Sequence, residues 1–229
     1  MMTVPGRVEA ASLLLSLDPP PWLVRHSRAV AEVAGWLAAR IDLRGVAVDL
    51  RLVESAALLH DIDKALPADD PARVLPHGEG SAAWLSRAGH GELARAVSSH
   101  SITRLLDEER FQHWTAYASR EERIVAYADK RAGQRLESMD ARFASWRRRY
   151  LPGSGNGRTA AWDEAALVAV RARAVRLEAD VCRAAGVPPG GVRRLAWTGA
   201  ALRAAVSTRL GTQLDGTPRD GTRPAHARS

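Results

Sequence analysis

The stretch Leu58-Leu59-His60-Asp61-Ile62-Asp63-Lys64 ends an apolar segment with a histidine directly followed by an aspartate. The residues before it, from about position 50, have the apolar spacing of a buried helix. A His-Asp pair at the end of such a helix places an imidazole nitrogen beside a carboxylate oxygen, a combination that suits divalent Fe, Mn, Zn or Ni. Because this dipeptide is common by chance, its meaning depends on whether other helices supply further ligands.

The composition limits the class of protein. The chain has 229 residues, which allows one large domain or one domain with an appendage, and 46% of them are apolar. The single Cys182 excludes an intramolecular disulfide and a cysteine-based zinc site. No apolar run approaches the roughly 20 residues that span a bilayer, and residues 11–17 lack the flanks of a signal peptide. We therefore expect a soluble cytoplasmic protein with no membrane partner.

The charge balance is basic, with 33 Lys and Arg against 26 Asp and Glu and a net charge of +7. This excess favours an anionic partner, although a composition rich in Arg and Ala is also typical of GC-rich genomes. The basic residues are scattered among acidic ones, and no nucleic-acid motif is present. We expect a small phosphorylated substrate rather than nucleic acid, and the sequence does not indicate an oligomeric state.

Good helix formers dominate and alternating β-branched runs are scarce, so we expect an all-α fold. The predicted helices cover about residues 8–17, 22–40, 50–60, 81–88, 92–106, 121–149, 163–186 and 192–210. The acidic and aromatic segment 107–119 is predicted to be a loop or a short irregular helix.

The Gly-rich stretch 151–158 is the clearest break in the chain and is predicted to be a linker. It would separate a domain of residues 1–150 from a C-terminal helical appendage of residues 159–210. Asp163 and Gly186 have the residue types that begin and end helices. The tail 211–229 has almost no apolar residues and is predicted to be disordered.

Four ionisable residues fall on apolar helix faces or at the ends of apolar runs: His26, His60, His100 and Asp129. A lone histidine on such a face is more often a hydrogen-bonded core residue. Asp129 could pair with Lys130 or Arg131, although adjacent residues point to different sides of a helix. A buried carboxylate without a partner is costly, and a bound cation removes that cost. Four such residues on successive helices favour a metal site.

With His77 included, the order His, His-Asp, His, His, Asp resembles the HD superfamily of metal-dependent phosphohydrolases. The matching stretches are Val24-Arg-His26-Ser, Leu58-Leu-His60-Asp61-Ile-Asp-Lys64, Pro76-His77-Gly78, Ser98-Ser-His100-Ser and Val125-Ala-Tyr-Ala-Asp129-Lys-Arg131. The resemblance covers roughly residues 21–146 and implies a helical bundle with a metal site in its centre.

The resemblance also implies the ligands. The four-ligand set of the family would be His26, His60, Asp61 and Asp129. The two further histidines of a dinuclear branch would be His77 and His100, with Asp61 bridging both metals. We expect two divalent ions, Fe or Mn, with Zn, Ni, Co or Mg as alternatives. The His-Asp-x-x-Lys and His-Gly stretches most resemble the bacterial branch that cleaves diadenosine tetraphosphate, from which residues 107–119 and those after Trp146 depart.

The chemistry of such a site assigns further roles. Two cations bridged by Asp61 would lower the pKa of a water and provide hydroxide near neutral pH. Lys64, one turn past Asp61, is the predicted catalytic phosphate contact. Asp63 is predicted to orient a ligand histidine or a water. Arg131 and Arg135, placed on the same helix as the last ligand, are further phosphate-binding candidates, with solvated surface charges as the plainer interpretation.

We therefore predict a metal-dependent phosphohydrolase that cleaves a phosphoester or phosphoanhydride of a small nucleotide by attack of a metal-activated hydroxide. The nucleotide would be a dinucleoside polyphosphate or a nucleoside phosphate. Two alternatives stay open: an HD-fold nucleotide-binding regulatory module without turnover, and an RNA- or DNA-directed phosphodiesterase. His90, His113 and His226 have weaker claims to the site. Trp114 or Tyr117 would stack on a base only if segment 107–119 folds over the site.

Overall fold

A computed structural model describes residues 4–150 and 162–215 of the chain. The helices are α1 (Arg7–Ser16), α2 (Pro21–Asp42), α3 (Leu50–Leu59), α4 (Glu79–Arg87), α5 (Ala94–Ser98), α6 (Glu108–Tyr117), α7 (Arg120–Arg131), α8 (Met139–Tyr150), α9 (Glu164–Ala185) and α10 (Thr198–Asp215). Short 3₁₀ turns lie at Ile62–Ala65, Pro71–Val74, Gly91–Leu93, Ile102–Leu105 and Pro189–Gly191. Within these ranges no strand forms, which confirms the predicted all-α fold. None of the described helices is long and apolar enough to cross a membrane.

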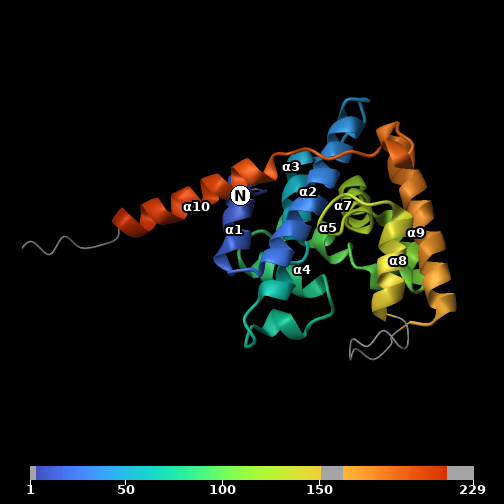
Figure 1. Cartoon of the computed structure of the whole chain (residues 1–229), viewed down its shortest axis with the longest axis horizontal. Helices are drawn as coiled ribbons and strands as arrows, with labels where there is room; N and C mark the ends of the chain where they lie inside the picture. The colour runs from blue at the N-terminus through green and yellow to red at the C-terminus, as the bar shows by residue number, and fades with distance from the viewer. Residues whose placement is uncertain (1–3, 151–161, 216–229) are drawn as a thin grey trace, which may run out of the picture.

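Helix α2 is the central element of the bundle (Figure 1). It packs against α3, α7 and α9, so its buried residues occupy most of its circumference rather than one narrow stripe. It begins at Pro21, where the fixed backbone angle of proline suits the first helical turn. This central position buries the turn of α2 that carries His26 between the ends of α3 and α7.

Helix α3 leads directly into the His-Asp pair. Its N-cap is Asp49, whose carboxylate accepts a hydrogen bond from Leu52 N at 2.9 Å. All residues from Val53 to Leu59 are buried, so the helix end lies inside the protein. The chain then tightens into a 3₁₀ turn, with Lys64 N donating to Asp61 O at 3.0 Å. A buried helix end followed by a tight turn holds His60 and Asp61 in the interior.

The predicted helix over residues 121–149 is wrong, because α7 ends at Arg131 and α8 begins only at Met139. Ala132 is extended, with φ −125° and ψ 126°, and Glu137 N donates to Arg131 O at 2.7 Å across the turn. Helix α8 then starts anew, with Ser138 Oγ accepting from Ala141 N at 3.1 Å. Arg135 consequently lies exposed in the turn and not on the Asp129 helix.

Two further segments differ from the sequence-based expectation. Instead of one helix over residues 92–106, the short α5 ends at Ser98, and 3₁₀ turns flank it. The segment 107–119 is a regular helix, α6, whose N-cap Asp107 accepts from Arg110 N at 2.7 Å. Trp114 is buried and donates its indole N–H to Glu122 at 3.2 Å, so it packs in the core instead of offering a stacking surface.

The C-terminal helices pack on the core. Helix α9 begins after Asp163 and ends at Gly186, which has φ +66°, as predicted, and it lies against α2 and α7. Helix α10 packs against α1, and its far end extends away from the other helices (Figure 1). It begins at Thr198 and not near residue 192, because the segment before it is not helical and Leu195 N donates to Glu32 O at 3.0 Å.

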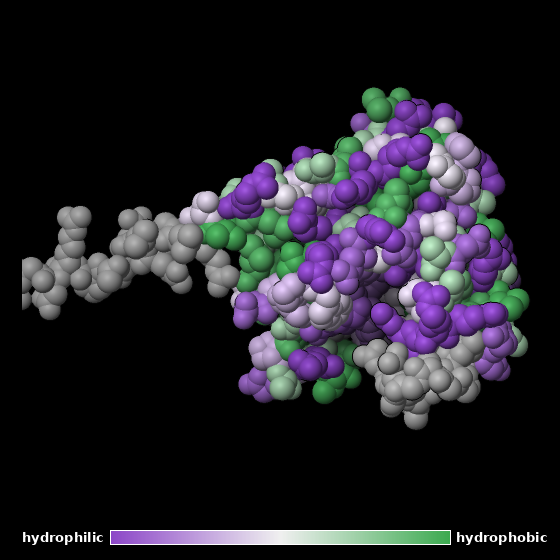
Figure 2. Space-filling model, viewed as in Figure 1, coloured by the Kyte–Doolittle hydropathy of each residue, from purple (hydrophilic) through white to green (hydrophobic). Residues whose placement is uncertain are grey.

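Part of the predicted disordered tail, residues 211–215, belongs to α10. The rest of that tail, residues 216–229, and the predicted linker 151–158 lie outside the described residues. On the face shown in Figure 2, apolar residues gather where α10 leaves α1, and hydrophilic residues edge a hollow near the middle of the molecule.

Candidate metal centre

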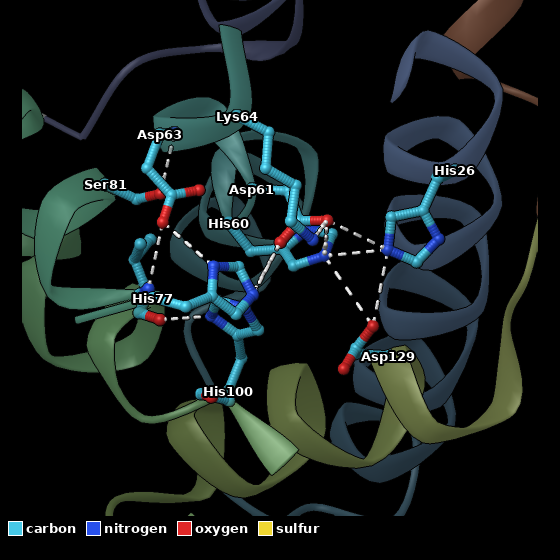
Figure 3. Close-up of polar contacts among 12 residues, drawn as sticks. His26, His60, Asp61, Asp63, Lys64, His77, Ser81, His100 and Asp129 are labelled. Carbon is cyan, nitrogen blue, oxygen red and sulfur yellow. Dashed lines mark hydrogen bonds and ion pairs between the residues drawn. The ribbon is translucent and has the colours of Figure 1, made fainter. Parts of the chain in front are cut away.

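The six side chains predicted as metal ligands lie together in one cluster (Figure 3). They come from five places in the chain: His26 from α2, His60 and Asp61 from the end of α3, His77 from the loop before α4, His100 from the end of α5, and Asp129 from α7. His60, Asp61 and His100 are at most 1% exposed. Four helix ends and one loop therefore build the site, and no single segment holds more than two of its members.

The four imidazole rings are fixed by their Nδ1 atoms. His26 Nδ1 lies 2.7 Å from the carbonyl oxygen of Gly133, and His60 Nδ1 lies 2.8 Å from that of Ala57. Since a carbonyl can only accept, both Nδ1 atoms carry hydrogen and donate.

The same pattern holds for the other two rings. His100 Nδ1 lies 2.5 Å from the carbonyl oxygen of Val97, and His77 Nδ1 lies 2.9 Å from Asp63 Oδ2. In the neutral ring a donating Nδ1 leaves a lone pair on Nε2, which is the arrangement of a metal-ligating histidine. All four Nε2 atoms are thereby set up as ligands.

The first group of ligand atoms surrounds one position between α2, α3 and α7. His26 Nε2 lies 3.1 Å from His60 Nε2, 3.3 Å from Asp61 Oδ2 and 3.3 Å from Asp129 Oδ1. His60 Nε2 lies 3.5 Å from Asp61 Oδ2 and 3.8 Å from Asp129 Oδ1. Ligands bound at about 2.0–2.2 Å to a common ion lie roughly 3 Å apart. These four residues fit one divalent cation.

The second group involves the other oxygen of the same carboxylate. Asp61 Oδ1 lies 3.1 Å from His77 Nε2 and 3.4 Å from His100 Nε2, and the two Nε2 atoms are 3.1 Å apart. Asp61 therefore presents Oδ2 to one pair of histidines and Oδ1 to the other pair. This geometry fits a carboxylate that bridges two cations.

With all four rings neutral, the cluster is electrostatically unfavourable without a cation. Two pairs of Nε2 atoms face each other at 3.1 Å, although each ring already donates from Nδ1. Asp61 Oδ1 is buried and has no hydrogen-bond partner among the described residues. Facing lone pairs and an orphaned carboxylate oxygen are costly in the interior, whereas a divalent ion satisfies them together. The residues present thus fit a metal centre.

Protons compete for the same atoms. Burial lowers the pKa of His26, but its hydrogen bonds to Asp129 and Asp61 outweigh burial and raise the pKa to about 9. Burial also lowers the pKa of His77, but its hydrogen bonds to Asp61 and Asp63 outweigh burial and raise that pKa to about 9. For His60, burial and the neighbouring histidines lower the pKa to about 3. Each metal position thus includes one imidazole that holds a proton at neutral pH when no metal is present.

We expect metal binding to strengthen as the pH rises. Because Nδ1 is already hydrogen-bonded, an added proton must sit on Nε2, the metal-binding atom. A cation therefore displaces one proton from His26 or from His77, and its apparent affinity should increase about tenfold per pH unit, up to a pH of about 9. Competition against a chelator of known affinity at several pH values measures this slope. The expected rise is on the order of 100-fold across two pH units below pH 9, and an affinity that stays constant over that interval would contradict the proton competition.

Asp63 and Lys64 flank the cluster from the 3₁₀ turn after Asp61. Asp63 Oδ2 accepts from His77 Nδ1 at 2.9 Å and from Gly78 N at 3.1 Å, so it orients the ring of His77. Lys64 Nζ donates to Asp61 Oδ2 at 2.5 Å, and its side chain is 37% exposed. Asp63 also falls within a possible ligand group with Asp61 and His77, but its Oδ2 is already engaged by the His77 ring.

The backbone conformation directly after His77 requires a glycine at position 78. Its φ is +89°, a conformation that side chains other than glycine rarely adopt. A Cβ atom at this position would also lie 3.2 Å from the ring of His100 and from the carbonyl oxygen of Ser98. The His-Gly pair in the sequence therefore reflects the close approach of the two histidine segments.

Lys130 borders the site as a partner of Asp129, a pairing that the sequence raised but that helix geometry disfavoured. It is 1% exposed, and its Nζ donates to Asp129 Oδ2 at 3.0 Å and to the carbonyl oxygen of His100 at 2.5 Å. The expectation that Lys130 points away from Asp129 is wrong, because its long side chain folds back over the helix end. It ties together two ligand segments that are far apart in the sequence. Its position directly after Asp129 was the only available signal.

The structure does not bring the two arginine candidates to the cluster. Arg131 is 6% exposed, and its guanidinium donates to Glu178 Oε1 at 3.0 Å and to the carbonyl oxygen of Pro189 at 3.1 Å. Those partners leave it no access to a bound phosphate. Arg135 lies in the exposed turn between α7 and α8. Of the predicted phosphate contacts, Lys64 alone lies against a metal-ligand candidate among the described residues.

Removal of a histidine from the second group should remove one ion and leave the other. We expect His77→Ala to lower the metal content from about two ions to about one per chain while the fold survives, because the first group keeps all its ligands. Elemental analysis and circular dichroism measure the two quantities. The control His113→Ala removes an exposed imidazole outside the cluster and should leave the metal content unchanged. Retention of both ions by His77→Ala would refute the dinuclear arrangement.

The comparisons with known proteins agree with this geometry. Residues 23–133, just under half of the chain, match the family model of the HD domain. Ribonuclease Y of Chlorobium phaeovibrioides is 38% identical over 79 residues, which are 34% of this chain and 13% of that protein. The aligned part thus spans only a small fraction of this relative. No solved structure matches the chain. The matched HD region contains all six candidate ligands.

Proposed function

We propose that this protein is an HD-domain phosphohydrolase that cleaves a phosphoester or phosphoanhydride bond of a small nucleotide, with two divalent ions as its cofactor. The substrate would be a dinucleoside polyphosphate or a nucleoside phosphate. The observation that carries the proposal is the carboxylate of Asp61, whose two oxygens face two separate pairs of histidine Nε2 atoms. An arrangement of this kind suits phosphoryl transfer, where two ions about 3.5–4 Å apart act on one phosphate.

The ions, when bound, would supply an acidified water and positive charge for the phosphoryl oxygens. They would be held by His26, His60 and Asp129 on one side of Asp61 and by His77 and His100 on the other. The chain holds these ligands in place before substrate arrives, because every Nδ1 atom has a fixed partner. Such preorganisation reduces the reorganisation that the reaction requires.

Substrate would approach from the side of Lys64 and His77. Their side chains are 37% and 35% exposed, whereas those of His60 and His100 are at most 1% exposed. Lys64 stays charged at neutral pH, because the carboxylate of Asp61 raises its pKa against the lowering effect of burial. When Asp61 binds metal, Lys64 is free to donate to a phosphoryl oxygen and stabilise the charge that develops there.

A second candidate function is the cleavage of RNA. It is favoured by the similarity to Ribonuclease Y, over 34% of this chain, and by the net charge of +7. We rank it below the small nucleotide, because the His-Gly stretch at His77 and the Lys64 position resemble the branch that cleaves diadenosine tetraphosphate. A cytoplasmic location and the choice of iron or manganese remain predictions.

The decisive experiment combines metal analysis with a substrate screen. Purified protein should contain two equivalents of a divalent metal and should release product from diadenosine tetraphosphate or from nucleoside phosphates, as resolved by chromatography. A short single-stranded RNA and a short single-stranded DNA are the competing substrates. Cleavage of RNA without turnover of any small nucleotide would favour the second candidate. Metal binding with no hydrolysis of either class would favour a regulatory nucleotide-binding module.

A further inference from the structure

A cavity lies beside the metal centre, between α5 and α6. Its volume is about 620 Å³, within the range of small-molecule sites. Ser98 and Ser99 line it, and the next residue, His100, turns its ring into the metal cluster. None of the six candidate metal ligands is among the described residues that line this cavity. It is therefore a separate space that shares one segment of chain with the metal centre.

The charges that line the cavity are unevenly paired. Glu122 is already satisfied, because it accepts from Ser99 Oγ at 2.8 Å and from the Trp114 indole N–H at 3.2 Å, and it pairs with Arg95 at 2.9 Å. Arg95 is thus neutralised by a neighbour within the same wall. The other acidic residue that lines the cavity, Glu109, is exposed.

Arg104 and Arg110 supply positive charge that the ion pair between Arg95 and Glu122 does not neutralise. Arg104 Nε is buried and has no hydrogen-bond partner among the described residues, and its Nη2 makes only a long contact of 3.4 Å with Ser98 O. Burial and the nearby charge of Arg110 lower the pKa of Arg104. Two neighbouring guanidinium groups, one with an unsatisfied buried donor, fit an oxyanion such as a phosphate.

An aromatic pair lines the same cavity. The rings of His113 and Tyr117, one helical turn apart on α6, have centroids 5.1 Å apart. Tyr117 is 72% exposed, an unusual exposure for a large aromatic residue at the rim of a cavity. Flat, accessible aromatic rings are the surfaces on which nucleobases stack.

We propose that this cavity is a second, non-catalytic binding site for a nucleoside phosphate. Its phosphate would lie between Arg104 and Arg110, and its base would stack on the exposed ring of Tyr117, with the His113 ring, inclined at 53° to it, against the edge of the base. The site goes beyond the proposed function, because binding there requires neither the metal centre nor turnover. Through Ser98 and Ser99, an occupied cavity would contact the segment that positions the metal ligand His100.

The test is a calorimetric titration with adenosine monophosphate of the metal-loaded protein and, in parallel, of Asp61→Asn, which is expected to lose the metal centre, so that binding in the cavity is the part that both share. We expect Arg104→Ala and Arg110→Ala each to weaken binding by about tenfold or more, as expected for the loss of a charge-assisted contact to phosphate. Arg203→Ala removes an exposed arginine from α10 and should leave the affinity unchanged. Inorganic phosphate and adenosine should each bind more weakly than the nucleotide, because each makes only part of the contacts.

Hydrolysis of bis(p-nitrophenyl) phosphate provides the second measurement. This small substrate should be hydrolysed at an unchanged rate in Arg104→Ala and Arg110→Ala, since neither residue lies in the metal cluster. Nucleotide affinity that is the same in both variants as in the wild type would overturn the site. If the arginine variants also lost hydrolysis of the small substrate, the cavity would not be separate from the metal centre. If inorganic phosphate bound as tightly as the nucleotide, the proposed contact with the base would be wrong. Arg104→Lys keeps the positive charge and serves as the second variant in case Arg104→Ala does not fold.

Discussion

Replacement of Asp61 by asparagine should abolish hydrolysis and strip the metal centre of both ions. The side chain keeps its size, but one ligand oxygen becomes an amide nitrogen that cannot coordinate, and the negative charge is lost. Because the two oxygens face different histidine pairs, both metal positions are weakened at once. We expect activity to fall by about 10³-fold or more. The rate of product release and the metal content of the purified variant measure the two effects.

The matched control is Asp69→Asn, which makes the same chemical change at an exposed aspartate outside the cluster. It should retain both ions and full activity. Loss of one ion alone in Asp61→Asn would show that this carboxylate serves a single metal position. Activity close to that of the wild type would show that the metal cluster is not the catalytic site.

Part of the candidate ligand set could be predicted from helix patterns, namely His26, His60, His100 and Asp129, whereas His77 and the complete set were implied by the resemblance to the HD superfamily. Leu23, Val30 and Leu37 mark the buried side of α2, and His26 falls within the same stripe. His60-Asp61 ends an apolar helix whose last residues are all buried. Local patterns of this kind place each residue in the interior. They could not show that the Nε2 atoms of different helices approach to 3.1 Å, which depends on how the helices pack.

The break between α7 and α8 shows where periodicity misleads. Ala132 and Leu136 continue the apolar spacing of the Asp129 helix, so the pattern predicts one long helix. In the structure the carbonyl oxygen of Gly133 instead accepts from His26 Nδ1 at 2.7 Å. In a continuous helix that carbonyl would bond the amide four residues later, at Glu137. Because α7 ends at Arg131, the carbonyl of Gly133 is free to orient the candidate metal ligand His26, which local propensity does not reveal.

The wrong expectation that Arg131 contacts phosphate has a similar cause. Arg131 and Tyr127 lie one turn apart on α7, and both contact Glu178 of α9, a residue 47 positions beyond Arg131 in the chain. Tyr127 donates its hydroxyl to Glu178 Oε1 at 2.7 Å, and Arg131 donates to the same oxygen at 3.0 Å. The sequence shows an arginine beside a site residue. Only the docking of α9 turns it into a buried structural partner.

Removal of Glu178 should therefore destabilise the fold more than removal of an exposed glutamate from the same helix. Glu178→Ala leaves the 6% exposed Arg131 without its counter-charge, which costs about 3–5 kcal/mol and lowers the melting temperature by roughly 10 °C. Glu164→Ala removes an α9 ion pair to Arg147 whose side chains are more than half exposed, and it should cost less than about 1 kcal/mol. Adding Arg131→Met to Glu178→Ala should recover part of the loss, because no buried charge then remains unpaired. Equal costs for the two glutamate variants in thermal and urea unfolding would mean that α9 is not held to the metal-ligand helix by this pair.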